Sequence, residues 1–285
     1  MKFEIITIFP DFFRGPLDYG IVRRAREAGL IDITVHDLRA YTHDRHRTVD
    51  DRPFGGGEGM VLKPEPIFAC VESLNVAPRK QRVEGANESV VLLSPQGQLF
   101  TQDVAQEMTA RERIVLICGR YEGVDERVGQ HLADCEISVG DFVLSGGELA
   151  AAIIVDAVTR LMPGALGNAA SSQQESFSYP IALKAGAMGT PNGDEQVVRN
   201  EGEPPSSTCA SGGLLDYPHY TRPAEFRGMQ VPEVLVNGNH EEIRRWRRRC
   251  ALQKTLHNRP DLLRSEALSQ EDRRLLAEIE GNMEV

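Results

Sequence analysis

Cysteines are few in this sequence, and they lack the spacing that metal sites and disulfide frameworks require. The five cysteines are scattered and no CxxC pair is present, which gives no support to a structural zinc site or a disulfide framework. Unpaired thiols fit a reducing compartment, so we expect a cytoplasmic protein. His43 and His46 are close in sequence, but their spacing within a loop is poor evidence for a metal. No metal ligand is therefore predicted.

Long hydrophobic runs and an excess of positive charge are also missing. No apolar stretch approaches the ~18 residues of a membrane-spanning helix. Glu4, Pro10 and Asp11 interrupt the N-terminal apolar run and no small-residue cleavage site follows, so we expect neither a signal peptide nor a membrane partner. The formal net charge is −10. Any nucleic-acid site must therefore be a local basic patch on an acidic body.

Two common phosphate-binding motifs are absent, and a different glycine pattern is present. No GxGxxG follows the first expected strand and no GxxxxGK[ST] occurs, which disfavours a Rossmann site and a P-loop. Instead, GRYEG (119–123) and SVGDFVLSGGE (138–148) each follow a short apolar run. Such turns let backbone amides approach a ligand closely, although two of them could equally close tight connections. LLSPQG (92–97) is a third apolar run that ends in a glycine-bearing turn. We therefore predict three loops over one pocket at the carboxyl ends of neighbouring strands.

Short apolar runs alternate with helical segments in the first part of the chain. We expect strands at 3–9, 31–37, 89–94, 113–118 and 135–139, and helices at 16–29, 64–74, 101–110, 122–132 and 146–161. This alternation predicts an α/β fold with a mostly parallel sheet covered on both faces. The segment 39–63 is expected to be a long loop, of the kind that is usually functional or mobile. Within it, GGGEGM (55–60) is either a phosphate nest or a flexible loop.

The composition changes after Pro163. Residues 166–212 are rich in small and polar residues without a sustained period, which is typical of a linker, and we expect 179–212 to be poorly ordered. After about residue 224 we find no strong strand signal and expect two helices, the second with Ser269 as N-cap and Asp272 at the capping-box position. The predicted organisation is a pocket-forming domain at 1–165, an interdomain linker with an insertion at 166–218, and a helical domain at 219–285.

Two segments have an ordinary and a functional interpretation. The helix after Gly147 carries the unbroken apolar run AAAIIV at 150–155, so it is either a core helix or a subunit interface. The arginine cluster at 244–249, with Trp246 inside it, is either a solvated helix face or an RNA-backbone surface. The density of arginines beside an aromatic ring, in so acidic a chain, favours RNA.

Five blocks of the sequence resemble, in order, the bacterial tRNA (guanine-N1)-methyltransferases, the TrmD family. They are TVDDRPFGGGEGM (48–60), LLSPQG (92–97), the segment 118–148, GLLDYPHYTRP (213–223) and NGNHEEIRRWRR (237–248). The resemblance implies a SPOUT fold with a C-terminal trefoil knot in the pocket-forming domain, and a homodimer. It also implies methyl transfer from S-adenosylmethionine to N1 of guanine 37 in tRNA. The family reaction is associated with Mg²⁺, for which the sequence shows no site.

The resemblance also implies individual site residues. It places S-adenosylmethionine on Leu93, Ser94, Pro95, Gly97, Gly119, Tyr121, Glu122, Gly123, Ser138, Val139, Gly140, Asp141, Phe142, Val143, Leu144, Gly146 and Gly147. It places tRNA contacts on Gly56, Gly57, His219, Arg222, Asn239, Arg244, Arg245 and Arg248. The chain departs from the family at Glu58, where proline is usual.

The catalytic residues follow from the same resemblance. Arg160 matches the family's catalytic arginine, and Glu175 stands in ESF where the family has the aspartate of DSF. N1 of guanine loses a proton as it attacks, which requires a general base, and the charge that then develops towards O6 favours a nearby cation. Glu175 is the expected base and Arg160 the expected cation, with Asp156 or Asp141 as other possible bases.

Two other functions stay open from the sequence. One is a related SPOUT methyltransferase that acts on another RNA or on a ribose hydroxyl, which would not need the linker carboxylate. The other is a non-catalytic RNA-binding protein that retains the ligand pocket.

Overall fold

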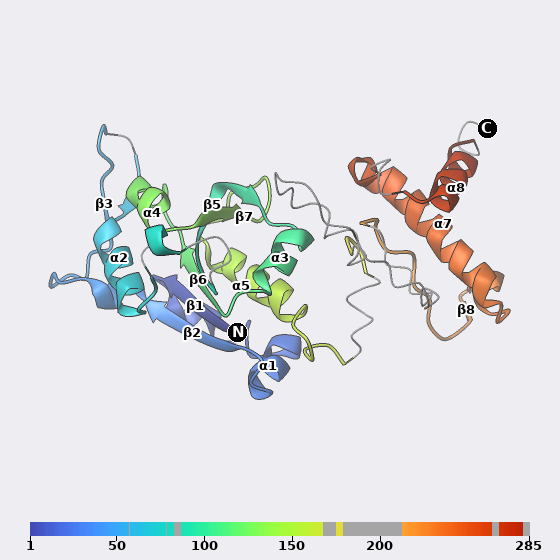
Figure 1. Ribbon diagram of the computed structural model, residues 1–285, viewed down its shortest axis with the longest axis horizontal. Helices are drawn as coiled ribbons and strands as arrows, with labels where there is room; N and C mark the ends of the chain where they lie inside the picture. Colours follow the sequence, from blue (N-terminus) through green and yellow to red (C-terminus); the bar gives the residue numbers. More distant parts are fainter. Residues whose placement is uncertain are drawn as a thin grey trace, which may run out of the picture. The chain divides into compact units, whose positions relative to one another are not determined.

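The structure, a computed structural model, describes residues 1–56, 58–77, 79–82, 87–167, 175–178, 213–263 and 268–281. The chain divides into two compact units, Met1–Gly167 and Asn168–Val285, and each is described by itself (Figure 1). The segment 179–212, for which the sequence predicts poor order, lies outside the described residues, as does Gly57.

A five-stranded sheet forms the centre of the first unit. Its order is β2 (Asp32–Asp37), β1 (Lys2–Thr7), β6 (Arg113–Cys118), β5 (Glu88–Leu99) and β7 (Cys135–Ser138), with every pair parallel. Along β6, Ile114 and Leu116 face one core while Val115 and Ile117 face the other. Because both faces are buried, the strands consist of unbroken apolar runs. The predicted α/β fold with a parallel sheet is confirmed.

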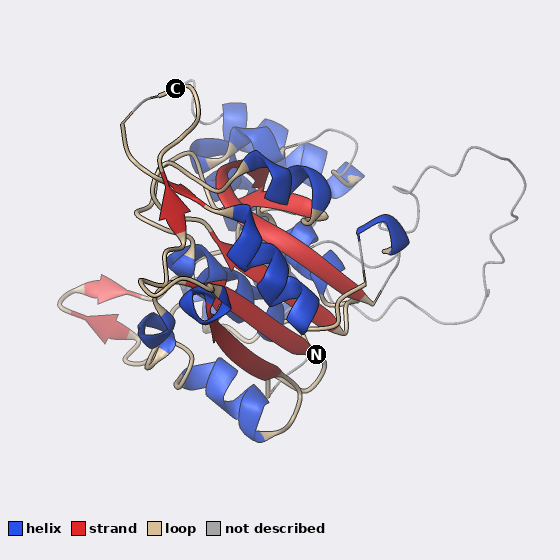
Figure 2. Ribbon diagram, turned by 90° about the vertical axis from the view of Figure 1, so that its left-hand side faces the viewer, coloured by secondary structure: helices blue, strands red, loops and turns tan. Residues whose placement is uncertain are grey.

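Helices cover both faces of this sheet (Figure 2). One core includes side chains of α1 (Gly20–Glu27), α3 (Gln102–Met108) and α5 (Glu148–Thr159). The other includes side chains of α2 (Pro64–Ser73), α4 (Glu126–His131) and the 3-10 turn η2 (Leu38–Tyr41). Two further 3-10 turns are η1 (Pro10–Phe13) and η3 (Arg79–Gln81). The carboxyl ends of β6, β5 and β7 meet at one edge, where the sequence predicts the ligand loops.

Three expectations for the first unit were wrong in detail. Helix α1 begins at Gly20 rather than near residue 16. The segment 39–63 is not all loop, because it holds η2 and the short antiparallel pair β3 (Asp50–Asp51) and β4 (Val61–Leu62). Strand β5 does not end at Ser94 but continues to Leu99 alongside β7, with a register shift between Leu93 and Gln98. The stretch SPQG is therefore an irregularity within a strand rather than a turn after one.

The second unit contains two long helices, as predicted. They are α7 (His240–Asn258) and α8 (Gln270–Gly281). The 3-10 turn η5 (Glu233–Leu235) precedes α7, and the 3-10 turn η6 (Pro260–Leu262) lies between the two helices. Ser269 Oγ accepts from Asp272 N at 3.1 Å while Asp272 Oδ2 accepts from Ser269 N at 2.9 Å. This reciprocal capping box confirms the predicted start of α8.

The second unit also contains a small hairpin that the sequence analysis missed. Strands β8 (Glu225–Phe226) and β9 (Met229–Gln230) pair around Arg227 and Gly228, both of which have positive φ. Such a two-residue turn suits the twist of paired strands. The strands are two residues long, which is too short for a periodic pattern to be recognised.

Candidate functional site

The three predicted loops line one pocket of about 300 Å³ in the first unit. Of the residues expected at the ligand, it is lined by Leu93, Ser94, Pro95, Gly119, Tyr121, Glu122, Gly123, Ser138, Val139, Phe142, Val143, Leu144, Gly146 and Gly147. Gly97, Gly140 and Asp141 are not among the lining residues. Gln96, Arg120, Glu136 and Ser145 line the pocket without having been predicted.

Glycines allow two of these loops to approach each other closely. Gly147 N donates to Gly119 O at 2.9 Å, and Arg120 and Gly146 form an isolated β-bridge. A Cβ on Gly147 would lie 2.8 Å from Cys118 Cα, a backbone atom that cannot give way. The glycine pair at 146–147 is thus required by the contact between loops, so the two loops form one wall of the pocket.

Two of the predicted residues outside the lining shape the loops instead. A Cβ on Gly97 would lie 2.4 Å from Ile137 N, so glycine is what lets β5 continue beside β7. Gly140 has a φ of +155°, and a Cβ there would lie 2.3 Å from the Phe142 ring. These glycines determine where Ser94 and Phe142 stand, rather than lining the pocket themselves.

A buried carboxylate connects the pocket to the sheet. Thr7 Oγ1 donates to Glu148 Oε1 at 2.7 Å, and Arg120 Nε donates to Glu148 Oε2 at 3.3 Å. The Glu148 side chain is only 2% exposed, and the Arg120 guanidinium lies 4.5 Å from the centroid of the Phe9 ring. Sequence analysis missed this cluster because its three members come from distant segments. A glutamate directly after the glycine pair was the available signal.

The Cys118 thiol, which lies near this carboxylate, is not a reactive nucleophile. Cys118 is fully buried, and that burial, together with the charge of Glu148, raises the pKa of its thiol well above the ordinary value. Because the thiolate is the nucleophilic form of cysteine, Cys118 serves the packing of the pocket wall.

The glycine-rich loop at 55–60 ends against the same pocket. Gly55, Gly56 and Gly59 all have positive φ, and Glu122 N donates to Met60 O at 3.0 Å. A Cβ on Gly59 would lie 2.4 Å from Glu122 Oε1. This loop therefore borders the pocket at Glu122. Its binding of an anion through Gly56 and Gly57 stays a prediction.

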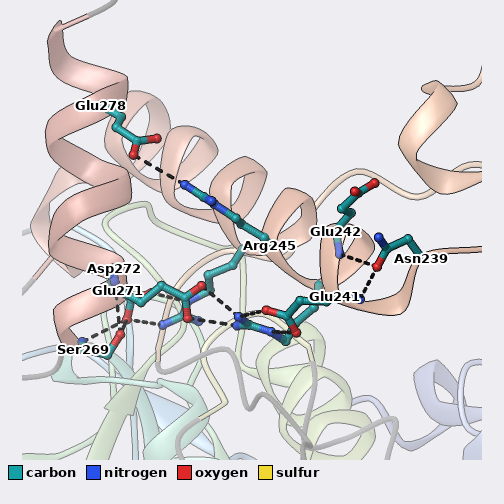
Figure 3. A network of polar contacts seen from close by, with 10 residues as sticks. Asn239, Glu241, Glu242, Arg245, Ser269, Glu271, Asp272 and Glu278 are labelled. Carbon is teal, nitrogen blue, oxygen red and sulfur yellow. Dashed lines mark hydrogen bonds and ion pairs between the residues drawn. The ribbon is translucent and has the colours of Figure 1, made fainter. Parts of the chain in front are cut away.

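Most of the arginines predicted to bind RNA form ion pairs within the second unit (Figure 3). Arg244 Nη2 lies 2.7 Å from Glu241 Oε1 and 2.9 Å from Glu271 Oε1. Arg248 Nε lies 2.6 Å from Asp272 Oδ1. Arg245 Nη2 lies 3.5 Å from Glu278 Oε1. The Arg244–Glu241 pair lies within α7, and the other contacts join α7 to α8. All of them provide the arginines with carboxylate partners.

Asn239 also has a structural role at this place. Its side chain accepts from Glu241 N at 3.2 Å and from Glu242 N at 3.3 Å (Figure 3), so it caps α7. The contacts of Asn239 and the three arginines with RNA stay predictions.

Comparison with known proteins identifies the family. The family model described as "tRNA (Guanine-1)-methyltransferase TrmD" matches residues 1–265. The chain belongs to the TrmD family. It is 64% identical over 279 residues to the "tRNA (guanine-N(1)-)-methyltransferase" of Koribacter versatilis, with 98% of each chain covered. The enzymes of the same name from Dictyoglomus turgidum and Geobacter metallireducens are 48% and 46% identical, over 98–99% of this chain and 98% of each relative.

The two residues predicted to be catalytic belong to different units. Arg160 is the C-cap of α5 in the first unit. Glu175 lies in the second unit, where Phe177 N donates to Leu214 O at 3.0 Å and Asp216 N donates to Ser176 Oγ at 2.9 Å. The segment 175–178 is thus held by the chain around Leu214 and Asp216. The joint action of Glu175 and Arg160 stays a prediction.

The described residues lack two further features. They contain no group of three or more His, Cys, Asp or Glu side chains arranged to hold a metal ion. Within the same ranges, no helix has the length and apolar character needed to cross a membrane.

Proposed function

We propose that this TrmD-family protein transfers the methyl group of S-adenosylmethionine to N1 of a guanine in tRNA, the guanine at position 37. The observation that carries the proposal is the pocket. Two glycine-bearing loops, after β6 and β7, and the irregular stretch SPQG of β5 converge on one pocket, in a chain 64% identical to a tRNA (guanine-N(1)-)-methyltransferase. Ligands of open α/β sheets bind at this edge.

The residues of the pocket fit S-adenosylmethionine as the methyl donor. Its volume of about 300 Å³ is at the lower end of the roughly 300–1,000 Å³ of small-molecule sites. Gly119, Gly146 and Gly147 let a ligand approach the backbone of the loops closely, while Tyr121 and Phe142 offer rings to a flat ligand. When bound, S-adenosylmethionine supplies an electrophilic methyl group on a sulfonium centre. We assign its binding to the lining residues of the three loops. No magnesium ligand is assigned.

Two side chains account for the chemistry at guanine. Glu175 accepts the N1 proton, which makes N1 nucleophilic, and a positioned base of this kind contributes about 10²–10⁴-fold. Arg160 stabilises the negative charge that develops towards O6, a role that suits a side chain which stays protonated and donates in a fork. The position of each residue in the TrmD sequence pattern supports this assignment.

We further propose a homodimer in which α5 lies at the subunit contact. Leu149 and Ile153 are one helical turn apart on α5 and are 49% and 47% exposed, whereas Ala150, Ala151, Ile154 and Val155 are buried. An apolar stripe left exposed on an otherwise buried helix is typical of an interface.

We also propose the SPOUT trefoil knot within 1–165, the linker at 166–218 and the helical tRNA-binding domain at 219–285. We propose a cytoplasmic location, because tRNA is the proposed substrate.

The experiment is methylation of unmodified tRNA transcripts with labelled S-adenosylmethionine, followed by nucleoside analysis. We expect 1-methylguanosine from a transcript with guanine at position 37 and none from the matched transcript with adenine there. A ribose-methylated nucleoside would indicate a different SPOUT activity. tRNA binding without any methylated product would indicate a non-catalytic RNA-binding protein.

A further inference from the structure

The second unit contains a pocket of its own, which we call the tail pocket. It has a volume of about 410 Å³ and is formed by residues 217–222, by aliphatic side chains between Val231 and Val236, and by Ile243 and Arg247 of α7. All of these residues belong to one unit. The pocket is therefore a property of the tail itself and does not depend on the placement of the first unit.

Aromatic and cationic groups are concentrated in the tail pocket. The Arg247 guanidinium lies 4.9 Å from the centroid of the Tyr217 ring, and the rings of Tyr217 and His219 are 4.7 Å apart. Asp216 Oδ2 lies 2.9 Å from His219 Nε2, which orients the imidazole. Tyr217 is thus fixed between two neighbours and forms a rigid wall.

Tyr220 is the ring of the pocket that remains available. It is 51% exposed, and its ring centroid lies 6.3 Å from that of Trp246, the only tryptophan of the chain. An exposed tyrosine supported by a second aromatic side chain is a ready stacking surface, because its orientation is already restricted before a ligand arrives.

The charge of the tail pocket contrasts with that of the whole chain. Among the described residues that line it, none is acidic, although the chain has a formal net charge of −10. Arg222 and Arg247 line it, and neither forms an ion pair with any described residue. Arg244 and Arg248 of the α7–α8 contact differ in this respect, because they are paired with carboxylates. The tail pocket therefore offers two cations whose charge is available to an anionic ligand.

We propose that the tail pocket binds one unstacked nucleotide of the tRNA, with the base against Tyr220 and a phosphate on Arg222 or Arg247. Proteins recognise single-stranded RNA by stacking splayed bases on aromatic side chains and guanidinium planes. A ring surface beside these two arginines fits this ligand in both its flat and its anionic part. The inference rests on the proposed function, since it takes tRNA as the substrate, and it adds the place in the tail where the RNA is held.

The first test is the affinity of the full-length protein for unmodified tRNA after removal of the ring. The change Tyr220→Ala should weaken binding by about 5- to 150-fold, the range for one stacked base. Tyr220→Phe keeps the ring and should stay within about twofold of the wild type. The matched control is Tyr19→Ala, which removes a tyrosine that is 73% exposed in the first unit and should leave affinity unchanged. S-adenosylmethionine affinity should be equal in all four proteins, which also reports that each is folded.

A second test separates stacking from phosphate contact. Tyr220→Ala should leave the salt dependence of tRNA binding unaltered, because it removes no charge. Arg247→Gln or Arg222→Gln should reduce the slope of log K against log salt by about 0.7 for each phosphate of a single strand that the protein no longer neutralises. An altered slope in Tyr220→Ala, or equal slopes in both arginine variants and the wild type, would contradict the assigned roles.

The outcomes distinguish failure of this inference from failure of the proposed function. If the wild type methylates tRNA and Tyr220→Ala binds tRNA as well as the wild type, the tail pocket holds no tRNA base and the activity stands. If guanosine monophosphate binds in the pocket while tRNA affinity is indifferent to Tyr220, the site is one for free nucleotides and the inference is wrong. If the wild type does not methylate tRNA, the proposed function itself fails.

Discussion

Individual glycines determine the geometry of the candidate active site. A Cβ on Gly146 would lie 2.2 Å from Arg120 Nε and 2.5 Å from Glu148 Oε2, so even alanine must displace a buried ion pair that joins two loops. The same side-chain atom is harmless where the backbone is open. At Gly167, an added Cβ would meet nothing within 4 Å, and the backbone there is not left-handed.

The change Gly146→Ala should therefore weaken S-adenosylmethionine binding by about tenfold or more, since it moves Arg120 or Glu148 and with them the pocket wall. Isothermal titration calorimetry without RNA measures this directly. Gly167→Ala is the matched control, with the same added methyl group and no expected change in affinity. Equal affinities for both variants would show that the Gly146 contact does not shape the donor site.

Glu175 is predicted to accept the N1 proton of guanine. Glu175→Gln preserves size and hydrogen bonding but cannot accept the N1 proton, so single-turnover methyl transfer should fall by roughly 10²–10⁴-fold. The affinities for S-adenosylmethionine and tRNA should remain near those of the wild type, which places the defect in the chemical step. Glu175→Asp, the family's usual side chain, should retain substantial activity. A Gln variant within a few-fold of the wild type would direct attention to Asp156 or Asp141.

At the scale of secondary-structure elements, one of the ion pairs between α7 and α8 is buried. Asp272 caps α8 through Ser269 and pairs with Arg248 of α7. Burial acts to raise the pKa of Asp272, but the hydrogen bonds and charge of Arg248 and the bonds from Ser269 outweigh it and lower that pKa. A carboxylate with a lowered pKa stabilises the folded state at pH values above its unfolded pKa. That stabilisation disappears as the pH falls through the folded value.

The change Asp272→Asn should destabilise the second unit by roughly 3 kcal/mol or more at neutral pH, because it removes the carboxylate charge that faces the buried Arg248 guanidinium. The variant should also show less of the acid sensitivity that the wild type has below pH ~4, the unfolded pKa of aspartate. Thermal unfolding followed across pH measures both effects. Glu278→Gln is the control, since it breaks an exposed pair across the same two helices and should cost less than about 1 kcal/mol. Equal destabilisation in the two variants would contradict the special role of Asp272.

The elements also show what the sequence could predict. The strands of the sheet were predictable because burial on both faces requires unbroken apolar runs such as RIVLIC. The start of α8 was predictable because its capping box is local. The continuation of β5 past Ser94 was not predictable, because it depends on the approach of Gly97 to the backbone of β7, a contact between distant segments. The pairing of Arg248 with Asp272 is non-local in the same way. A basic run in the sequence therefore gave no indication that its arginines were engaged.

At the scale of the whole molecule, the exposed apolar stripe of α5 predicts the assembly. The double change Leu149→Glu and Ile153→Glu places charges on this stripe, so it should convert a dimer into monomers and lower methyl-transfer activity. Sedimentation equilibrium at micromolar concentration measures the change. Met229→Glu is the control, because it charges an exposed apolar residue of the second unit, 62% accessible, and should leave the dimer intact. A wild-type monomer with full activity would contradict the proposed interface.

The buried contact of Glu148 with Thr7 and Arg120 has a thermodynamic consequence. It joins the first strand of the sheet, the loop after β6 and the start of α5, so the candidate donor site cannot loosen without opening the fold around it. Ligand binding and unfolding of the first unit are then linked equilibria. A ligand held only by the native pocket raises the melting temperature with the logarithm of its concentration. Substitutions that weaken this contact should therefore lower the melting temperature of the first unit both without donor and with it, even though Glu148 itself does not line the pocket.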